Sequence, residues 1–192
     1  MAVDSSQGLD TADRFEKLLA KAGAKDRSNI EKHLAACDAE DSPQHAMLWR
    51  RLVVTLGELA PMSMATVGTQ VVRFFIADGK YRMQVFAIED NRDGMLSVYL
   101  PNVMVKAVRE KLVLKKGERY SLAGPSHQLL SVEAIDANDP PDPPDHIKHM
   151  TGWNRKAVKA TLSTTESGGP QVDATERLCA LAAEQWAAPS HR

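Results

Sequence analysis

The 192-residue sequence contains little cysteine and few aromatic residues, and it has almost no net charge. Its two cysteines, Cys37 and Cys179, each lie in an apolar stripe of helical spacing, so we expect free, buried thiols in a reducing compartment. A formal net charge of -1 attracts neither nucleic acid nor an acidic membrane, so any such binding needs a local patch. No apolar run approaches the roughly 20 residues of a membrane-spanning helix, and the N-terminus lacks a signal-peptide pattern. These absences predict a cytoplasmic protein with no membrane partner.

The motifs of common catalytic and cofactor sites are also absent. The sequence contains no GxSxG, no phosphate-binding GxxxxGK[ST], no GxGxxG and no CxxC. Ser126 and His127 are adjacent in GPSHQ, but neighbouring side chains do not ordinarily face each other, and the stretch is typical of a turn. We therefore expect no cofactor, and the sequence favours a protein that is not an enzyme.

Hydrophobic residues make up 43% of the chain, which is enough for one good core. Residues 1–62 predict a helical N-terminal segment of three helices. Residues 63–192 predict an α+β domain with an antiparallel meander, a proline-rich loop at 138–145 and a C-terminal helix. We therefore predict an α+β fold, in which helices pack on one face of an antiparallel sheet behind a helical N-terminal segment.

Capping signals predict where the helices begin and end. Asp10 or Thr11 is expected to start the first helix, and Gly23 to end it in a left-handed conformation. A capping box that starts at Ser28 predicts the second helix. Ser42 followed by Pro43 predicts the third helix, which Pro61 ends, and Asp173 is expected to cap the last one.

Between residues 69 and 100 the pattern changes to that of strands. TQVVRFFIA, KYRMQVFAI and MLSVYL are rich in β-branched and aromatic residues, and turn signals separate them. Asp78-Gly79 predicts that the first two segments form an antiparallel hairpin. Further strands are expected in ERYSLA, LLSVEAI and the segment from Trp153 to Leu162, although the lysines of that segment also permit a helix. VMVKAVREKLV predicts a helix after the third strand.

The most unusual stretch is DPPDPPDHIKH at residues 139–149. Its aspartates recur every third residue, which is the period of polyproline II, so neighbouring carboxylates stand roughly 9 Å apart. That separation is too large for one calcium ion to be shared. The stretch is typical of a stiff acidic spacer, and a docking ligand for a partner is the alternative.

Two pairs of residues have the spacing of metal ligands. His146 and His149, three residues apart, are a candidate metal pair, with Asp145 or His127 as a third ligand that the sequence does not establish. His33 and Cys37 lie four apart on a predicted helix, and we interpret both as wall residues of the core.

Basic residues gather in two segments. Lys106 and Arg109 belong to a predicted helix that is followed by further lysines. Other basic residues surround Trp153. If the segments converge, they form a cationic patch beside an aromatic ring, which nucleic-acid backbones favour; two separate solvated faces are the alternative. The candidate residues for binding nucleic acid or a partner are Lys106, Arg109, Lys148, Trp153, Arg155 and Lys156.

The order of elements from Gly79 onward resembles that of the small YjbR/MmcQ-like proteins. The corresponding stretches are QVFAIEDNRDGMLSVYLPNVMVKAVREKL, HMTGWNRKAVKATL and DATERLCALAAEQW, about half of the chain. The resemblance implies an α+β domain that binds DNA and has no catalytic residues to carry over. By position, only Trp153 and the flanking Lys148, Arg155 and Lys156 correspond. An insertion before Trp153 and the three preceding helices depart from that pattern.

The leading functional hypothesis is a non-enzymatic interaction module that binds protein or nucleic acid through the basic surface around Trp153. The alternative is a small-molecule-binding protein or enzyme, with a pocket between the N-terminal helices and the sheet near His127, His146 and His149. The large apolar inventory and these histidines motivate the alternative.

Overall fold

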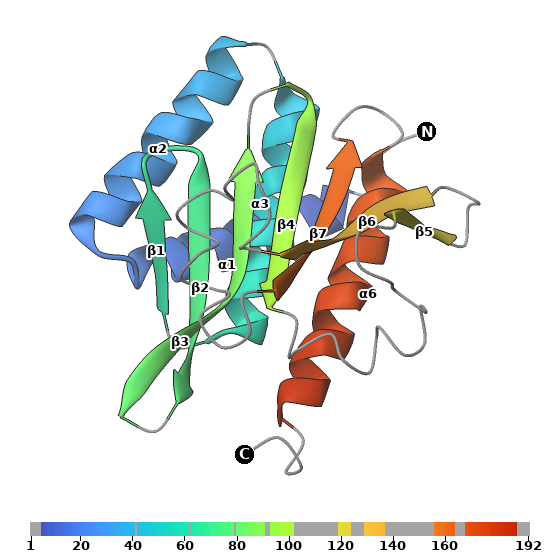
Figure 1. Cartoon of the computed structure of the whole chain (residues 1–192). Coiled ribbons are helices and arrows are strands. Elements are labelled where there is room, and N and C mark those ends of the chain that lie inside the picture. Colours follow the sequence, from blue (N-terminus) through green and yellow to red (C-terminus); the bar gives the residue numbers. More distant parts are fainter. Residues whose placement is uncertain are drawn as a thin grey trace.

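Seven strands form a single antiparallel sheet, with helices packed against it (Figure 1). The computed structural model describes residues 5–40, 42–61, 63–78, 80–90, 93–101, 119–123, 129–136, 156–163 and 168–187. The helices are α1 (Ser5–Ala20), α2 (Ala24–Ala39), α3 (Pro43–Leu59) and α6 (Gly168–Ala187). The strands are β1 (Ser63–Val67), β2 (Val71–Asp78), β3 (Tyr81–Asp90), β4 (Met95–Pro101), β5 (Arg119–Ala123), β6 (Leu129–Asp136) and β7 (Lys156–Ser163). The predicted α+β class with an antiparallel sheet is confirmed.

The strand order is β1-β2-β3-β4-β7-β6-β5, so the C-terminal strand β7 lies beside β4 in the middle of the sheet. The predicted hairpin of β2 and β3 is confirmed, with Asp78 opposite Tyr81. The segment that ends at Leu162 is the strand β7, and the helical alternative for its described residues is wrong. Strand β1 has no counterpart among the predicted strands, because MSMATV is too short to stand out from the end of the preceding helix.

Helices α1, α3 and α6 lie behind the sheet in Figure 1, while α2 lies at the β1 edge. Strand residues of period two face these helices, including Val72, Phe74, Leu96 and Val98, and all four are buried in the main core. A bulge in the β2–β3 pairing places Phe74 opposite Phe86 and Phe75 opposite Gln84. It turns both Val85 and Phe86 toward the same core.

Helix α3 packs one face against this core. Its buried residues include Leu48, Trp49, Leu52 and Leu56. At Gly57 a β-carbon would lie 2.6 Å from Leu18 Cδ2, so the absence of a side chain lets α1 approach α3 closely.

Several predicted helix ends are wrong. Helix α1 begins at Ser5, upstream of the expected cap, and ends at Ala20, where N–H groups bond to carbonyls three residues back. Gly23 is extended, with φ -61° and ψ 155°, and it precedes α2 as its N-cap. Helix α2 begins at Ala24, so Ser28 lies inside it and caps nothing. Ser42 and Pro43 do begin α3 as predicted.

The C-terminal helix α6 begins at Gly168, five residues before the expected cap Asp173. Asp173 instead accepts a hydrogen bond from Arg51 of α3, which also binds Glu176. Contacts between helices, and not local capping patterns, therefore determine where these helices begin and end. Cys37 and Cys179 are buried and not joined by a disulfide, as predicted.

Strand β1 forms one edge of the sheet, and α2 protects that edge. The Thr66 N–H and hydroxyl both donate to Asp26 Oδ1, at 2.7 and 2.8 Å, and Asn29 also donates to the Thr66 hydroxyl. An edge N–H that is satisfied in this way is not available for pairing with another chain. Among the described helices, none is long and apolar enough to cross a membrane.

Candidate metal centre

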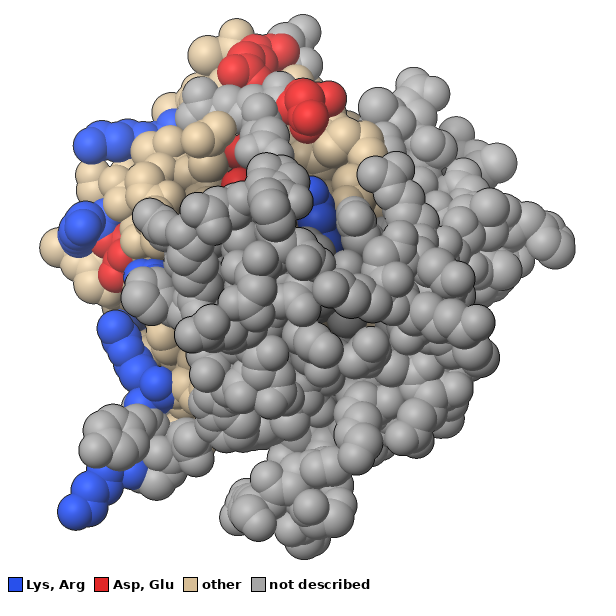
Figure 2. Space-filling model, viewed as in Figure 1, with Lys and Arg blue, Asp and Glu red and all other residues tan. Residues whose placement is uncertain are grey.

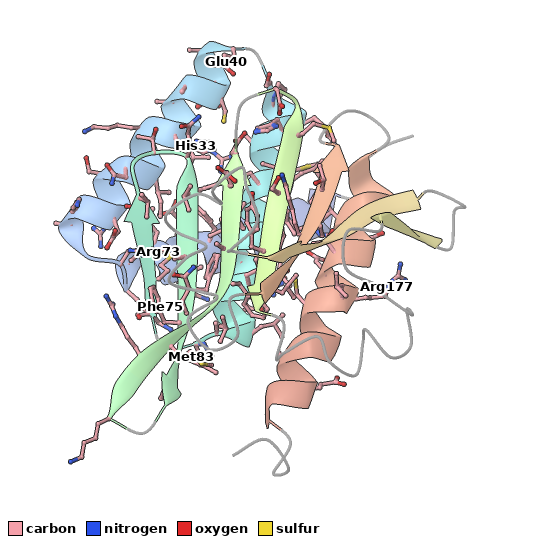
Figure 3. All side chains as sticks on the ribbon, in the orientation of Figure 1. His33, Glu40, Arg73, Phe75, Met83 and Arg177 are labelled. Carbon is pink, nitrogen blue, oxygen red and sulfur yellow. The ribbon has the colours of Figure 1, made fainter. Side chains whose placement is uncertain are left out.

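Four buried side chains with metal-binding atoms meet where α2, α3 and the end of β3 come together. They are His33 and Cys37 of α2, His45 of α3 and Asp90 of β3. Their exposed fractions are 0%, 1%, 8% and 0%, so the cluster lies in the interior. One donor atom from each lies within 4.8 Å of the donor atoms of all the others. Figure 3 labels His33 on α2, where that helix passes the end of the sheet.

Local structure explains how three of these side chains reach the same place. His33 and Cys37 are separated by one helical turn, so they lie on the same face of α2. The connection to α3 is short, and the Ser42 N–H donates to the Cys37 carbonyl. Pro43 at the start of α3 then places His45 in the first turn of that helix.

Asp90 arrives from a distant part of the sequence. It is the last residue of β3, opposite Leu96 of β4, and its N–H donates to the Gln70 carbonyl. Side chains alternate along the strand, so Asp90 points to the same side as the buried Ile88. The strand therefore carries a carboxylate into the gap between α2 and α3.

The distances show which atoms converge. Asp90 Oδ2 lies 2.9 Å from His33 Nε2 and 2.5 Å from His45 Nε2. Cys37 Sγ lies 3.7 Å from His33 Nε2. Both imidazoles are directed at one carboxylate oxygen, and the thiol stands beside them.

These four donors lie within 4.8 Å of one another and can reach the geometry of a tetrahedral zinc ion when the side chains move by about 1 Å. Zinc bonds of about 2.0 Å to nitrogen or oxygen and 2.3 Å to sulfur place N/O ligand atoms about 3.3 Å apart and N and S about 3.5 Å apart. The Cys37–His33 distance of 3.7 Å is close to that value. The two His–Asp distances are hydrogen-bond lengths, and the Asp90 oxygen needs to move by less than about 1 Å to accept an ion between them.

The charges of the donor set favour a divalent ion. A thiolate and a carboxylate together carry two negative charges, and two neutral imidazoles add none. A Zn²⁺ ion makes the buried group neutral, which removes the cost of an unpaired charge in the interior. Without an ion, the two imidazole N–H groups can donate to Asp90, so the same residues also form a hydrogen-bonded cluster. In that hydrogen-bonded cluster, Cys37 has no need to be a thiolate.

Packing fixes the His33 ring. The Trp49 ring lies with its centroid 4.6 Å from that of His33 at an interplanar angle of 38°, and Phe15 packs edge-on against Trp49. Within the described residues, His33 Nδ1 is buried and has no hydrogen-bond partner. The orientation of this ligand therefore depends on aromatic packing, whereas metal-bound histidines usually donate Nδ1–H to a neighbouring acceptor.

Most residues that the sequence singled out lie outside the described residues. This holds for Lys106, Arg109, Lys148, Trp153, Arg155, Asp145, His127, His146 and His149. Lys156 begins β7 opposite Asp136. The surface around Trp153 and the metal pair of His146 and His149 therefore stay predictions.

Two of the four residues of the cluster can be paired from the sequence alone. The four-residue spacing of His33 and Cys37 places both on one helix face, but no third ligand follows from the sequence, which therefore favours wall residues of the core. No pattern in the sequence indicates His45 as a ligand. The acidic residues Glu89, Asp90 and Asp93 are typical of a solvated hairpin tip, and this interpretation is wrong for Asp90, which is fully buried. A buried aspartate at a strand end can be found only when the fold shows what it faces.

Other hollows in the described part of the chain do not resemble a catalytic site. A surface groove of about 330 Å³ lies between α1, α3 and α6, and Arg14 and Arg51 line it. Arg14 bonds to Glu58 and Asp10, and Arg51 to Glu176 and Asp173. The groove's two arginines are thus paired within the protein.

Comparisons with protein-family models, with curated proteins and with solved structures give no match to the chain. The resemblance to YjbR/MmcQ-like proteins therefore stays a prediction.

Proposed function

We propose that the protein is a non-enzymatic, zinc-binding module in which His33, Cys37, His45 and Asp90 hold one structural ion. The observation that carries the proposal is the convergence of four buried donors from three elements on one point. Two imidazoles and a thiolate select zinc over magnesium and calcium, which prefer oxygen ligands.

A structural role is favoured over a catalytic one. Structural zinc sites use four protein ligands, whereas catalytic sites keep one position open for water or substrate. Here the protein supplies four donors, and each is nearly or fully buried. A substrate would have no path to an ion that these four side chains enclose.

The ion's role is to hold α2 in place. This helix buries only Ile30, His33 and Cys37, and two of the three are proposed ligands. A bond from α2 to α3 and β3 through the ion replaces the apolar contacts that α2 lacks. An attached α2 also keeps Asp26 on the exposed edge of β1.

The proposed role in interaction with protein or nucleic acid through Trp153 and its basic neighbours is compatible with such a module. It depends on residues outside the described part of the chain. Nothing in the described residues favours the alternative of a ligand pocket near His127, His146 and His149.

The test is metal analysis combined with cobalt substitution. We expect one zinc ion per chain after purification without chelator. We also expect Co²⁺ added to the metal-free protein to give the strong visible bands of a tetrahedral site and a thiolate charge-transfer band in the near ultraviolet. Cys37→Ala should abolish the charge-transfer band.

Cys179→Ala is the matched control, because Cys179 is also buried but lies on α6 away from the cluster. Burial raises the pKa of its thiol, so it stays protonated and does not bind metal. A charge-transfer band that survives Cys37→Ala, or a protein that binds no ion, contradicts the proposal. Loss of the ion in a His146→Ala/His149→Ala variant would move the site to the other pair.

A further inference from the structure

A second unusual group lies on the sheet face that points away from α1, α3 and α6. Along β2, Val72 and Phe74 enter the main core, so Arg73 and Phe75 point to the opposite face. Figure 3 labels both residues on this strand. Arg82 of the neighbouring β3 lies over the same ring as Arg73.

Two cations therefore share one aromatic side chain. The guanidinium carbon of Arg73 lies 5.8 Å from the centroid of Phe75, and that of Arg82 lies 4.5 Å from it. One ring stabilises a cation by a modest amount, but two like charges beside it repel each other. Burial, and then the charge of Arg82, lower the pKa of Arg73.

Neither arginine forms an ion pair within the described residues, in contrast to Arg14 and Arg51. Arg73 Nε is shielded from solvent and lacks a hydrogen-bond acceptor there. Asp26 raises the pKa of Arg73 through its charge, but its Oδ1 already accepts two hydrogen bonds from Thr66. The two guanidinium groups thus have unused capacity to bind an anion.

More cations lie on the same side of the molecule. Figure 2 shows Lys and Arg side chains along the left edge, over α2 and the hairpin of β2 and β3, with a few Asp and Glu atoms among those over α2. A row of charges fits a polymeric anion better than a single small ion. Addition of a peptide strand at β1 is disfavoured, because Asp26 already occupies the Thr66 N–H. The exposed basic residues there are Lys25, Arg27, Lys32, Lys80 and Arg82.

We propose that Arg73 and Arg82 bind phosphate groups of a single-stranded nucleic acid along this edge. Guanidinium groups match phosphate oxygens with paired hydrogen bonds, and this geometry distinguishes them from lysine. The guanidinium groups of Arg73 and Arg82 both lie near the Phe75 ring. The distance between their carbons is therefore at most the sum of 5.8 Å and 4.5 Å, their distances from the ring centroid. The bases are not read by Phe75, because this residue is only 6% exposed.

The test is binding of a fluorescein-labelled oligothymidylate to the full-length protein, followed by fluorescence anisotropy at several salt concentrations. Each lost phosphate contact lowers the salt slope for a single strand by about 0.7, so Arg73→Gln/Arg82→Gln should lower it by about 1.4. At about 0.1 M monovalent salt this change corresponds to about 25-fold weaker binding. Arg73→Lys/Arg82→Lys should retain the salt slope.

Arg177→Gln is the matched control, because Arg177 is an exposed arginine on α6, distant from Arg73 in Figure 3. It should leave affinity and slope unchanged. Thermal unfolding of each variant checks that the fold persists. Absence of binding, or equal binding by the wild type and Arg73→Gln/Arg82→Gln, overturns the proposal. Equal affinity for a polyglutamate peptide of the same charge overturns its assignment to nucleic acid.

Discussion

Helices α2 and α3 are almost equal in length, at 16 and 17 residues, yet they are held in the fold by different means. Helix α3 buries nine residues, and most of them are apolar. Helix α2 buries three, of which only Ile30 is an ordinary core residue. Apolar burial alone accounts for the position of α3, but it does not account for that of α2.

The difference shows that α2, unlike α3, needs polar or metal-mediated contacts to stay attached to the fold. Burial of Ile30 contributes roughly 2 kcal/mol and the partly buried Leu34 adds less, and both are small beside the entropy of ordering 16 residues. The remaining buried groups of α2 are His33 and Cys37, and both face the cluster at Asp90. The attachment of α2 should therefore depend on metal, and that of α3 should not.

The largest expected effect on stability is that of a substitution in the apolar core face of α3. Leu52 is fully buried, so Leu52→Ala should lower the free energy of unfolding by about 2–5 kcal/mol. Urea denaturation with and without a chelator measures this loss. The loss should be the same in both conditions, and a loss that appears only with chelator would break the contrast between α2 and α3.

Removal of zinc should have the next largest effect. An ion present at about 100 times its Kd stabilises the folded state by about 2.7 kcal/mol, and a chelator removes that contribution. Cys37→Ala should make the protein insensitive to chelator, whereas Cys179→Ala should remain sensitive. The melting temperature of each protein with and without chelator provides the measurement. An unchanged chelator response in Cys37→Ala would contradict the account.

Acid should weaken metal binding. The Cys37 thiol must lose its proton to bind the ion, so the affinity should fall as the pH is lowered, by about tenfold per pH unit for one displaced proton. Competition with a zinc indicator at several pH values measures the slope. A flat profile would show that no proton is exchanged for metal.

Gly57→Ala should have a smaller effect, of about 1 kcal/mol, because the added carbon meets the flexible end of the Leu18 side chain. Leu18→Ala in the same chain should relieve part of this clash. A double-mutant cycle of unfolding free energies checks the coupling. This change acts on α1 and α3, so the response to chelator should not change.

The smallest expected effect is that of Glu58→Gln. Glu58 pairs with Arg14 at the surface, where 52% and 40% of the two side chains are exposed. An exposed pair contributes about 0.5 kcal/mol or less, and added salt should remove the difference. Urea denaturation at low and high salt measures it.

Much of the fold could be predicted from local patterns. Pro43 marked the start of α3, and Asp78-Gly79 marked the hairpin between β2 and β3. The predictions at Gly23 and Ser28 are wrong. Each residue is of a type that caps helices, but contacts with other parts of the structure determine where α1 ends and α2 begins. Helix ends depend on the whole structure more than helix interiors do.

The candidate site was less predictable than the fold. His33 and Cys37 could be paired by helical spacing, but Asp90 lies 45 residues beyond His45. Only the pairing of β3 with β2 and β4 fixes which way Asp90 points. A site that joins two helices to a strand end leaves no contiguous motif in the sequence.

Hydrogen exchange along α2 tests the central claim most directly. Amides of Ala24–Ala39 and Pro43–Leu59 would be followed with zinc bound and after chelation. We predict that chelation speeds exchange in α2 by a large factor while the middle of α3 stays protected. Equal protection of α2 in both states would contradict the proposal that a metal ion holds this helix in the fold.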